Sequence, residues 1–201
     1  MVDQQPGVRR QPPKVPRPEP VRRAVSPLIV ALGEHPAAAA VERFWSDNTF
    51  PLVEPAPTDD PDGQVLVTFC WRDAEAEEVL LFANRITDET RLDDSLMSRV
   101  PGTDLWHVGY LMEPDWRASY AFLVRTPGER APWLAEGNQV AIRTALDHGL
   151  RDPLNPMTCQ NRAGVTQSVV ALPGAAAQPW LESRPEVARA ATMDEFRRRT
   201  A

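Results

Sequence analysis

The stretch "MSRVPGTDLWHVGYLMEPDWRASYAFLV", residues 97–124, decides the fold of this chain. Within residues 104–113 the side chains at 106, 108, 110 and 112 share one face, and those at 105, 107, 109 and 111 share the other. This period of two is typical of a β-strand. The turn "EPDW" follows, and residues 117–126 alternate in the same way, with Tyr120, Phe122 and Val124 on one face. We predict two antiparallel strands joined by a short turn.

Further strands are predicted on both sides of this pair. Residues 64–73 place Val65, Val67, Phe69 and Trp71 on one face, and residues 77–86 and 164–174 also read as strands. Short strands separated by turn residues indicate a mainly β fold, an antiparallel sandwich. Residues 33–47 predict a flanking helix, and a helical turn or two is expected in residues 138–149. Residues 48–64 and 87–103 are expected to be irregular.

Composition narrows the classes of function. The 201 residues are 42% hydrophobic and 25% charged, which suits one packed domain, and the formal net charge is −6. A protein that binds along a nucleic-acid backbone is normally basic, so no nucleic-acid partner is expected. No stretch approaches the ~18 apolar residues of a membrane helix, so no membrane partner is expected either.

The two ends of the chain differ from the middle. Residues 1–27 contain seven prolines and six basic against two acidic residues, a local balance of +4. We predict a disordered Pro/Arg-rich tail there, because this composition cannot bury a core. Residues 28–183 are predicted to form the β-sandwich domain, and residues 184–201 a C-terminal helical tail.

The cysteines and the apparent lack of an export signal favour a cytoplasmic location. Cys70 and Cys159 are far apart in sequence and are expected to be free, buried thiols. The first apolar run begins at Ser26, is short, and is not followed by a usual cleavage site.

Motifs for catalysis and for metal binding are missing. No serine lies in a G-x-S-x-G turn, no glycine-rich phosphate loop occurs, and neither the histidines nor the cysteines have metal-ligand spacing. We therefore expect no catalytic residue, no bound metal and no cofactor. Arg99, Arg117 and Arg162 are the better candidates for ligand contact, because arginine can bind an anionic aromatic group by hydrogen bonds and stacking.

Six separate motifs resemble one known family. They are "FWSDNTFPLVEP", "VTFCWR", the opening stretch, "DPLNP", "NRAG" and "SVVALPGAAAQPWL", which occur in this order between residues 44 and 181. The sequence is similar to the N-terminal domain of enterochelin (ferric-enterobactin) esterases. The resemblance implies an immunoglobulin-like, early-set β-sandwich that precedes an α/β-hydrolase domain. It also implies cytoplasmic hydrolysis of ferric catecholate siderophores and release of their iron.

The resemblance further implies which partners to expect. In the family the Ser-His-acid triad lies in the hydrolase domain, and this chain ends about twenty residues after "QPWL". We therefore expect the substrate-side domain, with a ferric catecholate siderophore as ligand, its iron the only metal, and a separate α/β-hydrolase as a possible partner. The expected substrate-binding residues are Arg99, Trp106, His107, Trp116, Arg117, Tyr120 and Arg162, with the three arginines meeting at one rim of the sandwich.

Two other functions stay open on the sequence alone. One is a binding protein without a catalytic partner, which recognises a siderophore or, by analogy with other early-set domains, a carbohydrate. The other is a complete esterase with an unrecognised active site. A gene for an α/β-hydrolase next to this one would favour the accessory domain.

Overall fold

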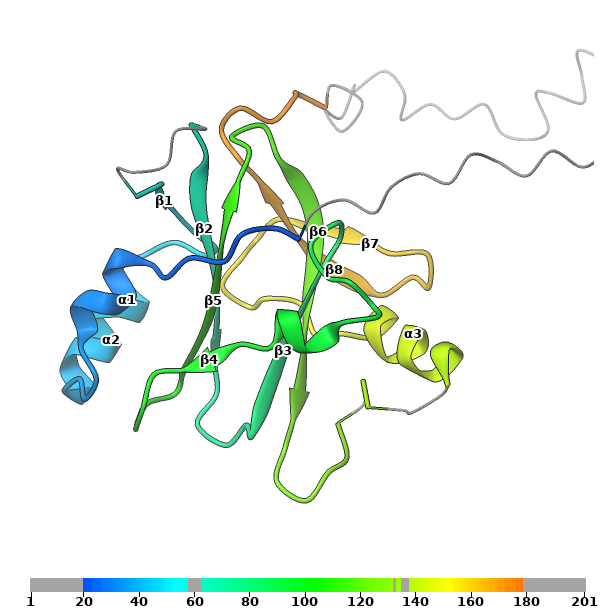
Figure 1. Cartoon of the computed structure of the whole chain (residues 1–201), viewed down its shortest axis with the longest axis horizontal. Helices are drawn as coiled ribbons and strands as arrows, with labels where there is room; N and C mark the ends of the chain where they lie inside the picture. Colours follow the sequence, from blue (N-terminus) through cyan, green and yellow to red (C-terminus); the bar gives the residue numbers. More distant parts are fainter. Residues whose placement is uncertain (1–19, 58–62, 132, 135–137, 179–201) are drawn as a thin grey trace, which may run out of the picture.

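Two four-stranded antiparallel sheets pack face to face in the computed structural model, which describes residues 20–57, 63–131, 133–134 and 138–178 (Figure 1). Sheet A has the strand order β1-β2-β5-β4 and contains β1 (Leu52–Pro55), β2 (Val65–Arg72), β4 (Ser98–Arg99) and β5 (Leu105–Met112). Sheet B has the order β3-β6-β8-β7 and contains β3 (Glu78–Ala83), β6 (Arg117–Arg125), β7 (Thr158–Gln160) and β8 (Thr166–Ala171). The mainly β sandwich predicted from the sequence is confirmed.

The inner faces of the two sheets form the main core. Val67 and Phe69 of β2 and Tyr120 and Phe122 of β6 are completely buried there. Trp71 is half-buried on this same face and packs against Phe122, with ring centroids 5.0 Å apart. The predicted face of β2 is therefore correct.

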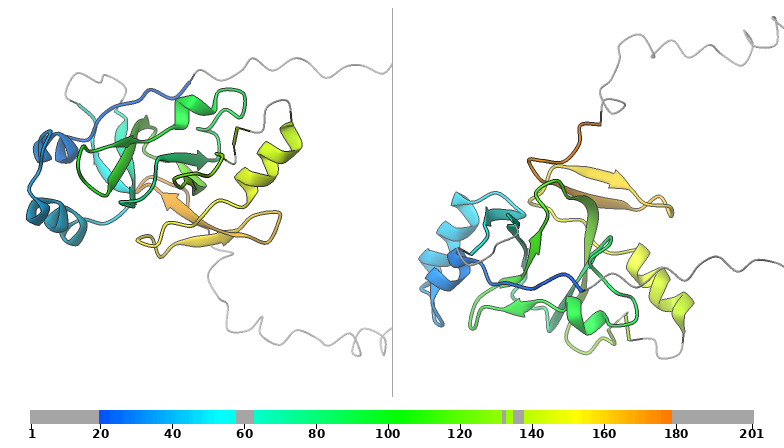
Figure 2. Two further views of the ribbon diagram at one scale, coloured as in Figure 1. Left: turned by 90° about the horizontal axis from the view of Figure 1, so that it is seen from below. Right: turned by 45° about the horizontal axis from the view of Figure 1, so that its top comes forward.

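Helices cover the outer faces of both sheets. Helices α1 (Pro27–Leu32) and α2 (Ala38–Asp47) lie on sheet A, and α3 (Gln139–Asp147) lies on sheet B, as both views in Figure 2 show. Because of these helices, Thr68 and Cys70 on the outer face of β2 are as buried as Phe69 on the inner face. No helix in the described part of the chain is long and apolar enough to cross a membrane.

Several short elements differ from the sequence expectation. Residues 27–32 form α1, with the buried Ser26 hydroxyl accepting hydrogen bonds from the amides of Leu28 and Ile29. Strands β1 and β7 lie at sheet edges, in segments too short and too polar for an alternating pattern. The 3₁₀ helix η1 (Leu92–Ser95) and β4 interrupt the loop expected between 87 and 103. The C-terminal helix predicted for residues 184–200 lies outside the described residues.

The predicted tail is wrong at its C-terminal end. Residues 22–24 run along β5: the amide of Leu111 donates to the carbonyl of Arg22, and the amide of Ala24 donates to the carbonyl of Gly109. Strand β4 pairs only with His107 and Trp106, so residues 22–24 cover the rest of the same edge of β5. The edge of a strand presents unpaired N–H and C=O groups, and residues 22–24 are ordered here because they pair with those of β5.

Gly109 gives a test of this packing. A Cβ atom on Gly109 would lie 2.4 Å from the carbonyl oxygen of Ala24 and 3.0 Å from the Thr68 hydroxyl. We expect Gly109→Ala to lower the free energy of unfolding by about 1–3 kcal/mol, because overpacking forces the backbone apart. Thermal denaturation followed by circular dichroism measures the change.

A shortened chain that begins at Ser26 serves as the control for Gly109→Ala. This chain lacks Ala24, so the substitution should cost clearly less in it, since only side-chain ends must then shift. An equal loss in both chains would mean that residues 22–24 do not constrain β5.

Candidate functional site

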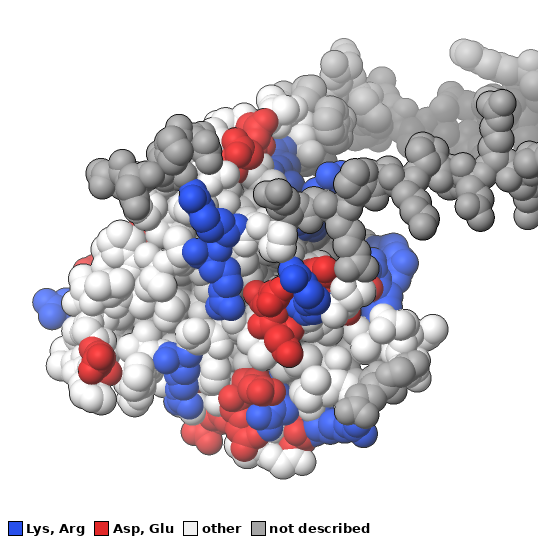
Figure 3. Space-filling view, in the orientation of Figure 1, with Lys and Arg blue, Asp and Glu red and all other residues white. Residues whose placement is uncertain are grey.

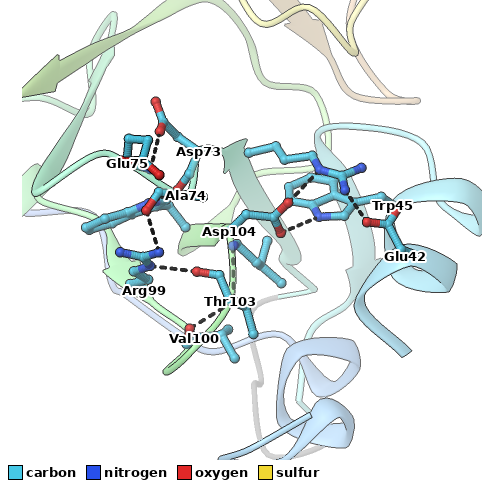
Figure 4. Close-up of polar contacts among 12 residues, drawn as sticks. Glu42, Trp45, Asp73, Ala74, Glu75, Arg99, Val100, Thr103 and Asp104 are labelled. Atoms are coloured by element: carbon cyan, nitrogen blue, oxygen red, sulfur yellow. Dashed lines mark hydrogen bonds and ion pairs between the residues drawn. The ribbon is translucent and has the colours of Figure 1, made fainter. Parts of the chain in front are cut away.

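Arg99 and Trp106 form part of a structural joint between loops. The Arg99 Nε donates to the carbonyl of Thr103 at 2.7 Å, its Nη2 donates to the carbonyl of Ala74 at 2.8 Å, and its guanidinium lies 5.5 Å from the centre of the Trp106 ring (Figure 4). Trp106 is only 6% exposed and donates its indole N–H to the carbonyl of Asp73. Both side chains therefore use their N–H groups to bind backbone carbonyls of the neighbouring loops.

A second group of charges in Figure 4 ties helix α2 to the same end of sheet A. The Asp104 carboxylate accepts hydrogen bonds from the Trp45 indole N–H at 3.1 Å and from Arg72 at 2.7 Å. Arg72 also forms an ion pair with Glu42 on α2. All of these charges are paired with one another, so this cluster holds the fold together.

Tyr120 lies at the centre of a buried polar network. Its hydroxyl donates to Asp152 Oδ2 at 2.8 Å and accepts from the Asn155 side-chain amide at 2.9 Å. The Ser168 hydroxyl accepts from the amide of Asp152 at 2.8 Å. Tyr120 is completely buried, so it anchors the "DPLNP" loop to the core and presents no surface to a ligand.

The three predicted arginines do not meet. Arg99 is paired with Trp106 at the start of β5, whereas Arg117 follows the turn at the end of β5. The eight residues of β5 span roughly 25 Å, so these two arginines lie at opposite ends of the strand. Arg162 lies in the β7–β8 turn and forms an ion pair with Asp147 of α3 at 2.7 Å. The expectation of one arginine-lined rim is wrong, because antiparallel strands put successive turns at opposite ends of the sandwich.

Trp116 and Arg117 lie together in the turn before β6. Trp116 is half-buried against the main core, and its carbonyl accepts a hydrogen bond from the amide of Leu172. The Nε of Arg117 is buried and has no hydrogen-bond partner among the described residues. This turn therefore offers one half-buried arginine.

The arginines that the structure brings together are different ones. A hollow of about 540 Å³ opens between the N-terminal segment, strand β5 and the loop from β3 to η1. We call it the Arg23 hollow. Its walls are Pro20, Val21, Arg23, residues 85–88, Arg91, Asp94 and Tyr110. Sequence reasoning missed this site, because it assigned residues 20–23 to a tail, Arg85 and Ile86 to a strand, Tyr110 to the core and residues 87–94 to a polar loop.

The charges in the Arg23 hollow are unequally paired. Arg91 forms ion pairs with Asp94 at 2.9 Å and with Asp88 at 3.8 Å, so both acidic side chains of the hollow face the same arginine. Among the described residues, the Arg23 side chain donates to the carbonyl of Leu96, at 3.0 Å, which leaves its charge in place. Basic and acidic side chains lie close together on the face of the molecule shown in Figure 3.

His107 lies beside the Arg23 hollow, unlike the other predicted residues. It is half-buried opposite Ser98 on β4, and both line a smaller hollow of about 120 Å³ that shares Arg23. Burial lowers the pKa of His107, and the nearby charge of Arg23 lowers it further, so the ring is neutral at pH 7. A neutral imidazole next to Arg23 can offer a hydrogen bond without adding charge.

Serine–histidine hydrogen bonds and clusters of metal-ligating side chains are both missing from the described residues. No hydrogen bond joins a serine hydroxyl to a histidine anywhere in the described ranges; Ser98 and His107 are only opposite each other. The same part of the chain has no group of three or more His, Cys, Asp or Glu side chains able to hold a metal ion.

Comparison with known proteins gives one consistent family. The family model described as "Enterochelin esterase, N-terminal" matches residues 66–181. The iron(III) enterobactin esterase of Dickeya dadantii is 30% identical over 122 residues, which are 57% of this chain and 28% of that protein. The iron(III) salmochelin esterase of Escherichia coli is 31% identical over 162 residues, which are 72% of this chain and 38% of that protein.

Solved structures agree with this family. The ferric enterobactin esterase from Salmonella typhimurium superimposes with a TM-score of 0.52 at 27% identity, over 68% of this chain and 38% of that one. The enterobactin esterase of Shigella flexneri, solved in the presence of 2,3-dihydroxy-N-benzoyl-glycine, gives a TM-score of 0.53 at 26% identity. The chain therefore spans well under half the length of the relatives that it matches.

The network around Tyr120 supplies a test of its structural role. Burial raises the pKa of the Asp152 carboxyl, and the hydrogen bond from Tyr120 opposes that rise. We expect Tyr120→Phe to lower the free energy of unfolding by about 1–3 kcal/mol, since it leaves buried polar groups without a partner. The pKa of Asp152 should rise further in the folded variant.

The dependence on pH separates this network from simple packing. Because its pKa is raised, the Asp152 carboxyl binds a proton more tightly in the folded state than in the unfolded state. The protonated carboxyl therefore favours folding at low pH, and this contribution to stability is lost as the pH rises. The loss caused by Tyr120→Phe should therefore grow as pH increases above about 4. Tyr110→Phe is the control, because the Tyr110 hydroxyl donates to a backbone carbonyl, that of Asp94. Equal pH profiles for the two variants would contradict the role of Asp152.

Proposed function

Because this chain belongs to the enterochelin esterase N-terminal family, we propose that it binds a ferric catecholate siderophore beside an α/β-hydrolase that cleaves the ester. The match over residues 66–181 carries the proposal, since it includes strands of both sheets, from β2 to β8. The hydrolase is a domain or a partner protein that supplies the nucleophile. Iron enters only as cargo of the siderophore.

The chemistry of the described residues supports a binding role. They contain no nucleophile and base in contact, and their arginines suit an anionic ligand. A protein with a net charge of −6 repels an anionic siderophore at long range, so a local group of arginines must reverse the field. The Arg23 hollow contains such a group.

Two finer features belong to the same proposal. We assign the sandwich to the immunoglobulin-like early-set type, which the family resemblance implies for two antiparallel sheets of this size. We also place the reaction in the cytoplasm, with which the free thiols of Cys70 and Cys159 agree, because thiols stay reduced there.

Isothermal titration calorimetry with ferric enterobactin tests the proposed function. We expect saturable binding that weakens as the salt concentration rises from about 50 to about 500 mM, because the attraction between exposed charges is screened. The iron-free siderophore, whose catechol groups are protonated and neutral, should bind more weakly. The chain alone should release no hydrolysis product, as measured by liquid chromatography.

Two results would contradict the proposal in different ways. If no heat of binding is seen at millimolar ferric enterobactin, the chain is not a siderophore-binding domain on its own. If the chain hydrolyses the siderophore without a partner, it holds a complete active site and the accessory role is wrong.

A further inference from the structure

We propose that Arg23 and Arg85 hold one catecholate arm of the ferric siderophore in the Arg23 hollow; this inference rests on the proposed function. The hollow has a volume of about 540 Å³, within the range of small-molecule pockets, about 300–1,000 Å³. Three arginines and two aspartates line it. Both aspartates pair with Arg91, so the charges of Arg23 and Arg85 are left to attract an anion.

Arg85 is held at the mouth of the hollow in an unusual backbone conformation. Its φ angle is 69°, in the left-handed region that side chains other than glycine, asparagine and aspartate rarely adopt. The loop is fixed there by Thr87, whose hydroxyl accepts from the amide of Ala83 and donates to the carbonyl of Leu81. Strained residues cluster at binding sites, and an exposed arginine is an unusual choice for such a position.

Arg85 and Arg23 keep their positive charges unneutralised. Neither lies within salt-bridge distance of a carboxylate in the described ranges, whereas Arg91 takes up both Asp88 and Asp94. Arg23 donates to one carbonyl, that of Leu96, and a guanidinium has five N–H groups, so several remain for a ligand. The two arginines can therefore receive the deprotonated oxygens of a catecholate.

Arg23 is positioned by the edge of β5. Its backbone forms a bridge with Tyr110, and the hydrogen bonds of Arg22 and Ala24 to Leu111 and Gly109 fix it on both sides. Because the backbone is fixed before a ligand arrives, binding needs little ordering of this segment.

The apolar part of the hollow favours an aromatic anion over an inorganic one. Val21 and Ile86 are partly buried against the main core and also line the hollow, next to Tyr110. An aromatic ring can cover such side chains. The burial of apolar surface then adds to the binding free energy that the charges supply. A phosphate or sulfate ion would leave these side chains in water.

Substitution of Arg85 tests the location directly. Arg85→Asn removes the charge, and asparagine tolerates a positive φ, so the variant should fold as well as the wild type. We expect the Kd for ferric enterobactin to rise about ten-fold or more in calorimetry, because a charge-assisted hydrogen bond is lost. Arg85→Lys should restore part of the affinity, and Arg23→Gln should weaken binding to a similar extent.

Arg43→Ala is the matched control. Arg43 is an exposed arginine on α2, and this helix lies far from the loop between β3 and η1 in both views of Figure 2. Within the described residues, its side chain donates to a carbonyl of its own helix, that of Ala39. Its removal changes the net charge by the same amount, so Arg43→Ala should bind like the wild type. Circular dichroism checks that all variants are folded.

The outcomes distinguish this inference from the proposed function. If the wild type binds and both Arg85→Asn and Arg23→Gln bind equally well, the site lies elsewhere and the proposed function stands. If inorganic sulfate displaces the ferric siderophore at equal concentration, the hollow is a simple anion site and the aromatic part of the inference is wrong. If the wild type binds nothing, both the function and the site are overturned.

Discussion

The pairing of β2 with β5 is the constraint on which the rest of the structure depends. Eight residues of each strand are in register, from Val65 opposite Met112 to Arg72 opposite Leu105. Because successive side chains point to opposite faces, this one ladder supplies both the main core and the layer beneath α1 and α2. A shift of one residue would exchange these two sets of side chains, so the register is fixed by burial on both sides.

The other edge of β5 links this fold to the candidate site. Strand β4 and residues 22–24 share that edge, and Gly109 is needed because the carbonyl of Ala24 approaches so closely. Closing the edge in this way brings Arg23 over β5 and next to the loop that follows β3. The Arg23 hollow is thus formed by the same packing that protects the edge strand from pairing with other chains.

The distribution of arginines separates those that hold the fold from those open to a ligand. Arg72, Arg99 and Arg162 each bind carboxylates or carbonyls that join two elements, so their charges or hydrogen bonds hold the fold together. Arg23 and Arg85 have no carboxylate partner among the described residues. In a chain with a net charge of −6, an anionic aromatic ligand gains the most binding free energy where unneutralised arginines lie beside apolar side chains.

The sequence by itself determined the strands β2, β3, β5, β6 and β8, the inner face of β2 and the family, because alternation of apolar side chains is a local property and the six motifs occur in order. Only the tertiary structure decided that residues 22–24 are ordered, that Tyr120 and Trp106 are buried in hydrogen-bonded joints, and that Arg99, Arg117 and Arg162 lie apart. Which side chains meet depends on strand order and on pairing between segments distant in sequence. The arginines at 23 and 85 come together only through that pairing, and no spacing between them in the sequence indicates it.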